Sequence, residues 1–212
     1  FYSLKPDMVV VAAFGQILPK AIIDFPPMGC LNIHPSLLPK YRGAAPLNWS
    51  IIRGETKTGV TIMLMDEGMD SGDILMQDET PLETAETFGE LHDRLSVLGA
   101  KLLLKTIEQV GASAVERRAQ DASAVTFAPR LTKETGKINW SDSAFNIVNL
   151  IRGLSPSPAA YTSLDGQPLK IYAAEARIGV VDLPPGSIGT DSSAGLPVAT
   201  SDGYVVLKDV QL

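Results

Sequence analysis

The chain has 212 residues, of which 45% are hydrophobic and 20% are charged, and its formal net charge is −6. This composition is typical of a globular protein with one large domain or two smaller ones, and the charge argues against a general polyanion binder, although it leaves room for a local basic patch. The single cysteine, Cys30, excludes an intrachain disulfide and a cysteine-based zinc site, and it suits a reducing compartment such as the cytoplasm. No apolar run approaches the roughly 20 residues of a membrane-spanning helix, and no signal peptide is visible.

Four segments in the first half have the length and composition of strands. They lie at residues 8–13, 29–34, 58–65 and 74–79. The first is a continuous apolar run, which is typical of a strand covered on both faces in a parallel α/β sheet. The last two flank an acidic, turn-rich loop and therefore predict a hairpin-like pair. Because the chain lacks an initiator Met and both ends fall in strand-like patterns, we expect a fragment of a longer fold.

Three helices are expected between these strands and after them. A short one follows Pro19, and a second begins at Pro46 and ends before Gly54. A long amphipathic helix is expected from about Thr87, with Thr84 or Thr87 as its cap, and Glu90 fits a capping box with Thr87. Together with the strands, these helices indicate an α/β domain over residues 1–111.

The second half has a different character. Residues 112–136 are polar and predict a linker, and residues 137–212 predict a small β-rich domain. That domain begins with a short helix, for which Ser141 is the expected cap. Short strands with turns between them are expected at residues 160–164, 169–174, 186–189 and 203–207. The dipeptide Asp165-Gly166 is a strong hairpin signal, and the spacing favours a small barrel or sandwich.

The most informative segment is residues 31–39, Leu-Asn-Ile-His-Pro-Ser-Leu-Leu-Pro. If residues 31–34 are extended, Asn32 and His34 point to the same face of the sheet. An amide that donates a hydrogen bond beside an imidazole that moves a proton is suited to acyl transfer. The alternative is a purely structural pair, in which Asn32 caps a turn and His34 lies in the core. The position of the pair favours a functional site, because sites in open α/β sheets lie at the carboxyl ends of strands.

The acidic loop at residues 66–73 supplies the expected third member of the site. Its carboxylates do not have the spacing of an EF-hand, so a calcium loop is disfavoured. The alternatives are a solvated turn or a carboxylate that reaches His34 and orients its ring. Asp70, next to Ser71-Gly72, is better placed for this than Asp66.

Other residues have weaker signals. The backbone and apolar side chains of Ser36, Leu37, Leu38 and Pro39 could hold a flat, partly apolar ligand. Arg42 could receive an anionic tail or a nucleic-acid phosphate, or it could be an ordinary loop residue. We expect His92 on the surface and Cys30 as a buried apolar residue.

These motifs taken together resemble the methionyl-tRNA formyltransferase family within the formyltransferases that use 10-formyltetrahydrofolate. The resemblance covers nearly the whole chain and rests on residues 32–39, 41–46, 59–63, 66–73, 137–140, 153–159 and 166–171. It implies an α/β fold with a Rossmann-like formyltransferase domain, here N-terminally incomplete. A small β-rich open barrel of the OB-like kind follows and helps to hold the tRNA.

The resemblance also implies the activity and the site. The implied reaction is formyl transfer from 10-formyltetrahydrofolate to the α-amino group of initiator methionyl-tRNA, for translation initiation, in a cytoplasmic, monomeric enzyme without metal or membrane contact. By position, the catalytic residues are Asn32, His34 and Asp70, and Arg42 binds substrate. The folate-binding positions are Ser36, Leu37, Leu38 and Pro39, with Phe14, Gly15, Gln16, Ile17 and Leu18.

The expected mechanism has Asn32 and a protonated His34 donating to the oxyanion, while Asp70 favours the charged imidazole. Two other functions are consistent with parts of the chain. One is a related formyltransferase that acts on a sugar-nucleotide amine. The other is a non-enzymatic nucleic-acid-binding module built on the C-terminal domain.

Overall fold

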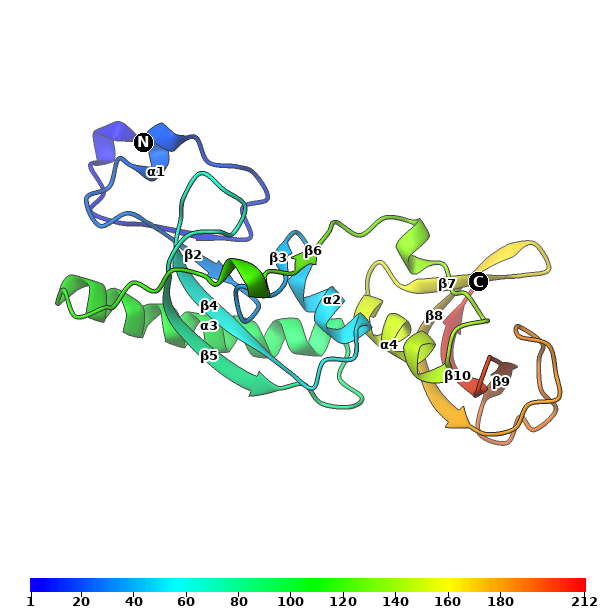
Figure 1. Cartoon of the computed structure of the whole chain (residues 1–212). Helices are drawn as coiled ribbons and strands as arrows, with labels where there is room; N and C mark the ends of the chain where they lie inside the picture. The colour runs from blue at the N-terminus through cyan, green and yellow to red at the C-terminus, as the bar shows by residue number, and fades with distance from the viewer. The chain divides into compact units, whose positions relative to one another are not determined.

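The computed structural model describes residues 1–212 and divides the chain into two compact units (Figure 1). The first unit comprises Phe1–Pro46, Lys57–Pro81 and His92–Arg130. The second comprises Leu47–Thr56, Leu82–Leu91 and Leu131–Leu212. The segment predicted as a linker is therefore divided between the units, and two short segments of the first half fold with the second half.

A four-stranded sheet forms the centre of the first unit. Its strands, in spatial order, are β1 (Val9–Ala12), β2 (Cys30–His34), β4 (Lys57–Leu64) and β5 (Ile74–Pro81). β1 and β2 are parallel, and the other neighbours are antiparallel, so the four predicted strands and the hairpin-like pair are confirmed. The predicted covering of both faces of β1 is wrong. Its residues alternate between partly buried and exposed, so one face of β1 is open. β1 is also an edge strand of this sheet.

The three helices predicted in the first half of the chain begin where the sequence predicts. A short 3-10 helix, η1 (Tyr2–Leu4), opens the chain; α1 (Lys20–Ile23) follows Pro19, and α2 (Pro46–Ile52) begins at its proline. Ahead of α3 (Phe88–Gly111), the backbone N–H of Thr87 donates to Glu90 at 2.9 Å and that of Glu90 donates to the Thr87 hydroxyl at 3.3 Å. This reciprocal pair is the predicted capping box.

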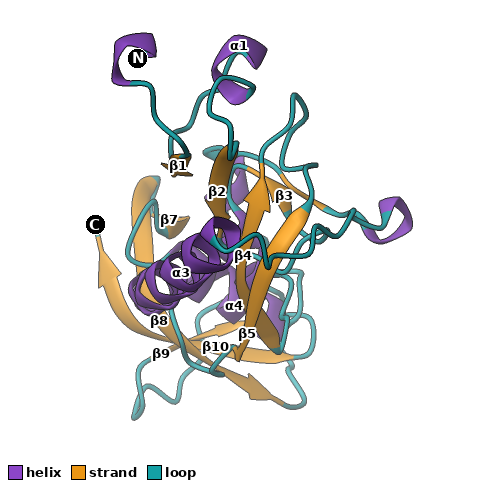
Figure 2. Ribbon diagram, turned by 90° about the vertical axis from the view of Figure 1, so that its left-hand side faces the viewer, coloured by secondary structure: helices purple, strands orange, loops and turns teal.

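The long helix α3 covers one face of the first unit's sheet (Figure 2). Gly99 allows a close approach, because a Cβ at that position would lie 3.2 Å from Cγ2 of Ile33 and 3.5 Å from Val60. Side chains alternate along a strand, so Asn32 and His34 point to the face opposite Ile33. The packing of α3 thus leaves the other face of β2 for the candidate site.

Two elements of the first unit lie in segments that the sequence indicated as loop and linker. The two-residue strands β3 (Arg42–Gly43) and β6 (Phe127–Ala128) pair in parallel. Between α3 and β6 lies the 3-10 helix η2 (Ala122–Ala124). These contacts join the segment before Arg130 to the first unit.

An antiparallel sheet forms the second unit, in the order β7 (Ala160–Leu164), β8 (Gln167–Ile178), β10 (Gly203–Gln211) and β9 (Leu196–Ala199). Positive φ angles of 49° and 79° at Asp165 and Gly166 give the predicted two-residue hairpin turn. The strand predicted at 186–189 is wrong, because Ile188 makes only an isolated bridge to Val198. β9 was not predicted because it contains Pro197, which an edge strand tolerates.

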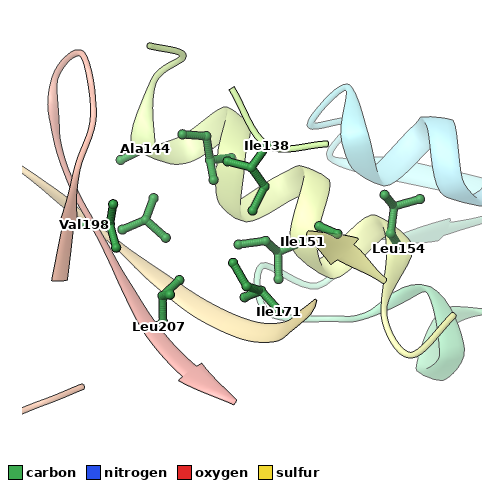
Figure 3. Close-up of a cluster of buried hydrophobic side chains, with 10 residues drawn as sticks. Ile138, Ala144, Ile151, Leu154, Ile171, Val198 and Leu207 are labelled. Atoms are coloured by element: carbon green, nitrogen blue, oxygen red, sulfur yellow. The ribbon is translucent and has the colours of Figure 1, made fainter. Parts of the chain in front are cut away.

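The helix α4 (Ala144–Leu154) packs on this sheet and closes the core (Figure 3). Its buried side chains Ile147, Ile151 and Leu154 face residues of β8, β9 and β10, among them Ile171 and Leu207. Each such fully buried aliphatic side chain contributes about 1.5–3 kcal/mol. The predicted cap Ser141 is wrong, since the Ser143 hydroxyl accepts the hydrogen bond from the Asn146 N–H at 3.2 Å.

Buried polar groups explain why two segments from the first half belong to the second unit. The Arg152 guanidinium donates to the carbonyls of Glu83 and Glu86 at 3.3 and 3.0 Å. The Asn48 amide donates to the carbonyl of Gly153 at 2.8 Å.

Another 3-10 helix, η3 (Glu134–Gly136), precedes α4. No helix of the chain is long and apolar enough to cross a membrane.

Candidate active site

Three polar side chains meet beside the carboxyl end of β2. Oδ1 of Asp70 lies 3.5 Å from Nδ2 of Asn32 and 3.6 Å from Nδ1 of His34. The two β2 residues therefore face the same side, as their spacing predicts. Asp66 has a different part in the acidic loop, because its carboxylate accepts hydrogen bonds from Gly68 and Ser71. We refer to Asn32, His34 and Asp70 as the polar trio.

The backbone of the acidic loop fixes the position of Asp70. Asp70 has a φ of 51°, a left-handed conformation that is uncommon for a residue with a side chain. Its Oδ2 accepts a hydrogen bond of 2.8 Å from the Gly43 N–H, which leaves Oδ1 facing the other two members of the trio. A Cβ at Gly72 would lie 1.8 Å from the carbonyl oxygen of Leu64, so the loop needs glycine there.

The environment of His34 decides its protonation. Its side chain is 4% exposed, and Nε2 lies 3.0 Å from the carbonyl oxygen of Tyr41. A carbonyl only accepts, so Nε2 carries the hydrogen and the lone pair of the neutral ring is on Nδ1, the nitrogen nearest Asp70. Burial lowers the pKa of His34 below its ordinary value of 6.5; Arg42 lowers it further, while Asp70 and the Tyr41 bond raise it.

The protonated His34 that the expected mechanism uses as a donor is therefore not the resting form of the ring. Asp70 favours the charged ring, as expected, but the cost of burying the charge is larger than this attraction. At neutral pH the ring is a neutral base with its lone pair on Nδ1. The trio is equipped to accept a proton during a reaction and then to stabilise the imidazolium through the Asp70 carboxylate.

Thr61 of β4 holds the segment from Ser36 to Pro39 in place through hydrogen bonds to its backbone. The Thr61 hydroxyl donates to the Ser36 carbonyl at 2.6 Å and accepts from the Leu38 N–H at 3.1 Å and from Gln77 at 2.9 Å. The side chains of Ser36 and Leu38 are buried, and the Ser36 hydroxyl donates to the Lys40 carbonyl. Those two side chains thus support the loop, and Leu37, Pro39 and the backbone are its partly exposed groups.

Replacing Thr61 by valine is expected to cost about 2–3 kcal/mol of unfolding free energy, because buried backbone groups of Ser36 and Leu38 lose their partner. Thr106→Val is the matched control. Thr106 is equally buried, but its hydroxyl only donates back to the carbonyl of Leu102 in the same helix, so its loss should cost about 1 kcal/mol or less. Urea unfolding of both variants checks the difference, and equal costs would contradict it.

The loop of Phe14, Gly15, Gln16, Ile17 and Leu18 leaves the carboxyl end of β1. β1 is parallel to β2, and Ala12 lies opposite Ile33. This loop and the trio therefore lie at the same end of the two strands. The side chains of Phe14 and Ile17 are 53% and 88% exposed. They offer apolar surface to a ligand at this end of the strands.

Arg42 lies next to the trio, but its guanidinium is bound to a neutral group. Its Nε and one terminal nitrogen donate to Oε1 of Gln120 at 3.0 and 2.7 Å. The charge of Arg42 is felt at His34. A guanidinium held by an amide keeps its full positive charge, so Arg42 stays suited to an anionic group of a substrate.

Sequence reasoning missed the residues that support the trio from a distance along the chain. Thr61, Gln77, Gln120 and Thr126 each bond to a loop of the site. No local pattern distinguishes these polar residues from surface residues. His92 is on the surface and Cys30 is fully buried, both as predicted, and burial raises the pKa of the Cys30 thiol. The chain contains no cluster of three or more potential metal ligands.

Comparison with known proteins decides the family. Residues 1–107 match the Formyl transferase family, and residues 130–212 match the Formyl transferase, C-terminal domain family. The methionyl-tRNA formyltransferase of Syntrophus aciditrophicus (strain SB) is 57% identical over 210 residues, 99% of this chain and 67% of the relative. The chain belongs to the methionyl-tRNA formyltransferase family. It spans about two thirds of the length of that relative.

Solved structures agree on the formyltransferase fold. HypX from Aquifex aeolicus, in complex with tetrahydrofolic acid, superposes with a TM-score of 0.76 at 20% identity, over 97% of this chain and 36% of HypX. An N-formyltransferase from Helicobacter canadensis, in complex with folinic acid and dTDP-3-aminofucose, has a TM-score of 0.71 at 23% identity, over 85% of this chain and 66% of its own. At these identities the likeness shows the fold, an α/β formyltransferase domain followed by a β-rich half-barrel domain.

Proposed function

We propose that the polar trio catalyses transfer of the formyl group of 10-formyltetrahydrofolate to the α-amino group of initiator methionyl-tRNA. The observation that carries this proposal is the meeting of Asn32, His34 and Asp70 at one Asp70 oxygen, in a chain of the methionyl-tRNA formyltransferase family. The residue roles follow from the chemistry of the groups.

His34 and Asp70 move and hold the proton. The amino nitrogen of the methionyl group bonds to the formyl carbon, and Nδ1 of His34 takes the proton that this nitrogen loses. The Asp70 carboxylate stabilises the imidazolium that forms. His34 then returns the proton to N10 of the folate as the bond between N10 and the formyl carbon breaks. The products are a formamide on the methionyl-tRNA and tetrahydrofolate, so the proton and all atoms balance.

Asn32 stabilises the oxyanion of the tetrahedral intermediate. Its amide nitrogen has two hydrogens, and one faces Asp70 at the long distance of 3.5 Å. The other is free to donate to the developing oxyanion. A donor held in place before the reaction contributes more than water does, because it needs little reorganisation.

The folate donor is expected at the carboxyl ends of β1 and β2, where both the loop from Phe14 to Leu18 and the trio lie. The exposed rings and aliphatic groups of Phe14 and Ile17 suit the flat pterin, and the backbone of Leu37 and Pro39 borders the same end of the strands. Arg42 is the proposed contact for a phosphate of the tRNA end. These residues form the binding part of the proposal.

The second unit is the proposed tRNA-binding unit. It has a pocket of about 250 Å³ bordered by Lys133, Lys170 and the ring of Tyr161. Two cations beside an aromatic ring suit a phosphate and a base of single-stranded RNA. In a chain with a net charge of −6, such local cations are where a polyanion would be bound.

A substrate comparison tests the function. The purified full-length protein should convert methionyl-tRNA and 10-formyltetrahydrofolate to formylmethionyl-tRNA, and tRNA in high salt should bind less well. The alternative acceptor is an amino-sugar nucleotide, the kind of ligand in the Helicobacter canadensis structure. Faster formylation of dTDP-3-aminofucose than of methionyl-tRNA would contradict the proposal, and failure to bind the folate would favour a non-enzymatic module.

A further inference from the structure

The segment of residues 118–128 contacts three loops of the active site, those of residues 36–39, 41–43 and 66–73. Its first residue, Arg118, pairs with Ile74 through both backbone groups at 2.8 and 2.9 Å. Near its end, Thr126 accepts the Tyr41 N–H on its hydroxyl, and β6 pairs with β3. Between these points, Gln120 reaches the Asp70 loop. The sequence pattern of this segment predicted only a linker, and the established family activity assigns no role to Gln120.

Gln120 uses its whole hydrogen-bonding capacity at the site. Its amide nitrogen donates to the carbonyl oxygens of Asp70 and Gly72, both at 2.8 Å. Its amide oxygen accepts two bonds from the Arg42 guanidinium. A primary amide has two donor hydrogens and two acceptor lone pairs, and all four are used. Such complete use restricts the side chain to one orientation.

We propose that Gln120 is a positioning residue that holds the Asp70 loop in the geometry that formyl transfer requires. This rests on the proposed function of the trio. The contacts around Gln120 form a closed ring. Gln120 binds the Asp70 carbonyl and the side chain of Arg42, and the next residue after Arg42, Gly43, donates its N–H to the Asp70 carboxylate. The ring fixes both the backbone and the carboxylate of Asp70.

The backbone of Asp70 explains why such a ring is needed. A residue other than glycine in the left-handed region costs about 1 kcal/mol or more, and it keeps that conformation only when its surroundings hold it there. The Gln120 bond to the Asp70 carbonyl acts at this strained residue. Without it, the loop is free to relax and to carry the carboxylate away from His34. The charged side chains that act on His34 are those of Asp70 and Arg42. Gln120 binds the backbone carbonyl of Asp70 and the guanidinium of Arg42.

Two variants at position 120 distinguish the bonds that the amide nitrogen of Gln120 donates from those that its amide oxygen accepts. Gln120→Ala removes all four bonds, and Gln120→Glu keeps the acceptor for Arg42 but places a carboxylate against two carbonyl oxygens. Glu116→Ala, an exposed change in the same part of the chain, is the matched control. We expect both Gln120 variants to lower kcat by roughly 10- to 100-fold with KM for both substrates changed less than about threefold. The control should match the parent protein.

Full activity of Gln120→Glu would overturn the proposal, because it would show that only the contact with Arg42 matters. A double-mutant cycle tests whether Gln120 acts through Asp70. In an Asp70→Asn background, Gln120→Ala should lower kcat by less than about twofold more, because Gln120 acts through Asp70. Fully additive losses would also overturn the proposal.

A measurement without turnover separates this proposal from the proposed function. The chain has two histidines, so an NMR titration of His34 can be assigned with a His92→Gln variant. Gln120→Ala should move the His34 midpoint to lower pH, as Asp70→Asn does, because the stabilising carboxylate leaves the ring. An unchanged midpoint would overturn the positioning role even in a protein that fails to formylate methionyl-tRNA.

Discussion

Replacing Asn32 by alanine is expected to lower kcat of formyl transfer by about 10²–10³-fold while KM for the folate stays close to that of the parent protein. The amide of Asn32 has a second hydrogen that can face the oxyanion, and it lies on the same side of β2 as His34. A donor that acts mainly on the oxyanion stabilises the transition state more than the bound substrate. Steady-state kinetics with saturating methionyl-tRNA measure the change.

A control is needed because Asn32 also touches Asp70. Asn146→Ala, at an exposed position of α4, changes the same residue type away from the site and should leave kcat and KM unchanged. Urea unfolding should give Asn32→Ala within about 1 kcal/mol of the parent protein, because its bond to Asp70 is long. Turnover within threefold of the parent would remove Asn32 from the mechanism. A loss confined to KM for the folate would assign Asn32 to binding instead.

The elements of the fold that could be predicted are those with local signals. Apolar runs identified β2, β4 and β5, and the proline of α2, the capping box of α3 and the Asp165-Gly166 turn each contain their own cause in neighbouring residues. β9 and β3 failed because neither has a pattern of its own. Their pairing depends on partners elsewhere in the chain, Tyr204 to Leu207 for β9 and Phe127 and Ala128 for β3.

In the candidate site, too, the features that could be predicted are those with a local signal in the sequence. The spacing of Asn32 and His34 fixed their common face, and the turn chemistry of the acidic loop singled out Asp70. Two properties needed the three-dimensional structure. Burial of the His34 ring depends on its three-dimensional surroundings, and this burial lowers the pKa of the ring. The role of Gln120 depends on contacts with residues 50 and 78 positions away, which no local pattern contains.

The neutral state of His34 leads to a pH dependence with a defined sign. A base must be unprotonated to act, so the acid limb of kcat/KM should lie at a pH below the ordinary histidine value of 6.5. Asp70 raises the pKa of His34, so Asp70→Asn should move the limb further toward acid and lower kcat as well, because the imidazolium loses its carboxylate. His34→Asn should lower kcat by about 10²-fold or more and abolish the limb. A pH–rate series on the three proteins measures this.

The same pKa gives a matching prediction for stability. The folded chain holds His34 neutral more strongly than the unfolded chain does, so as the pH falls below 6.5 the unfolded state takes up the proton first. This contribution to stability is therefore present above 6.5 and is lost as the pH falls through the folded pKa. In His34→Asn that part of the decline should vanish, while His92→Asn, on the surface, should retain it. If activity instead falls as the pH rises through the pKa of His34, the protonated ring is the active form, and the donor role would then replace the base role.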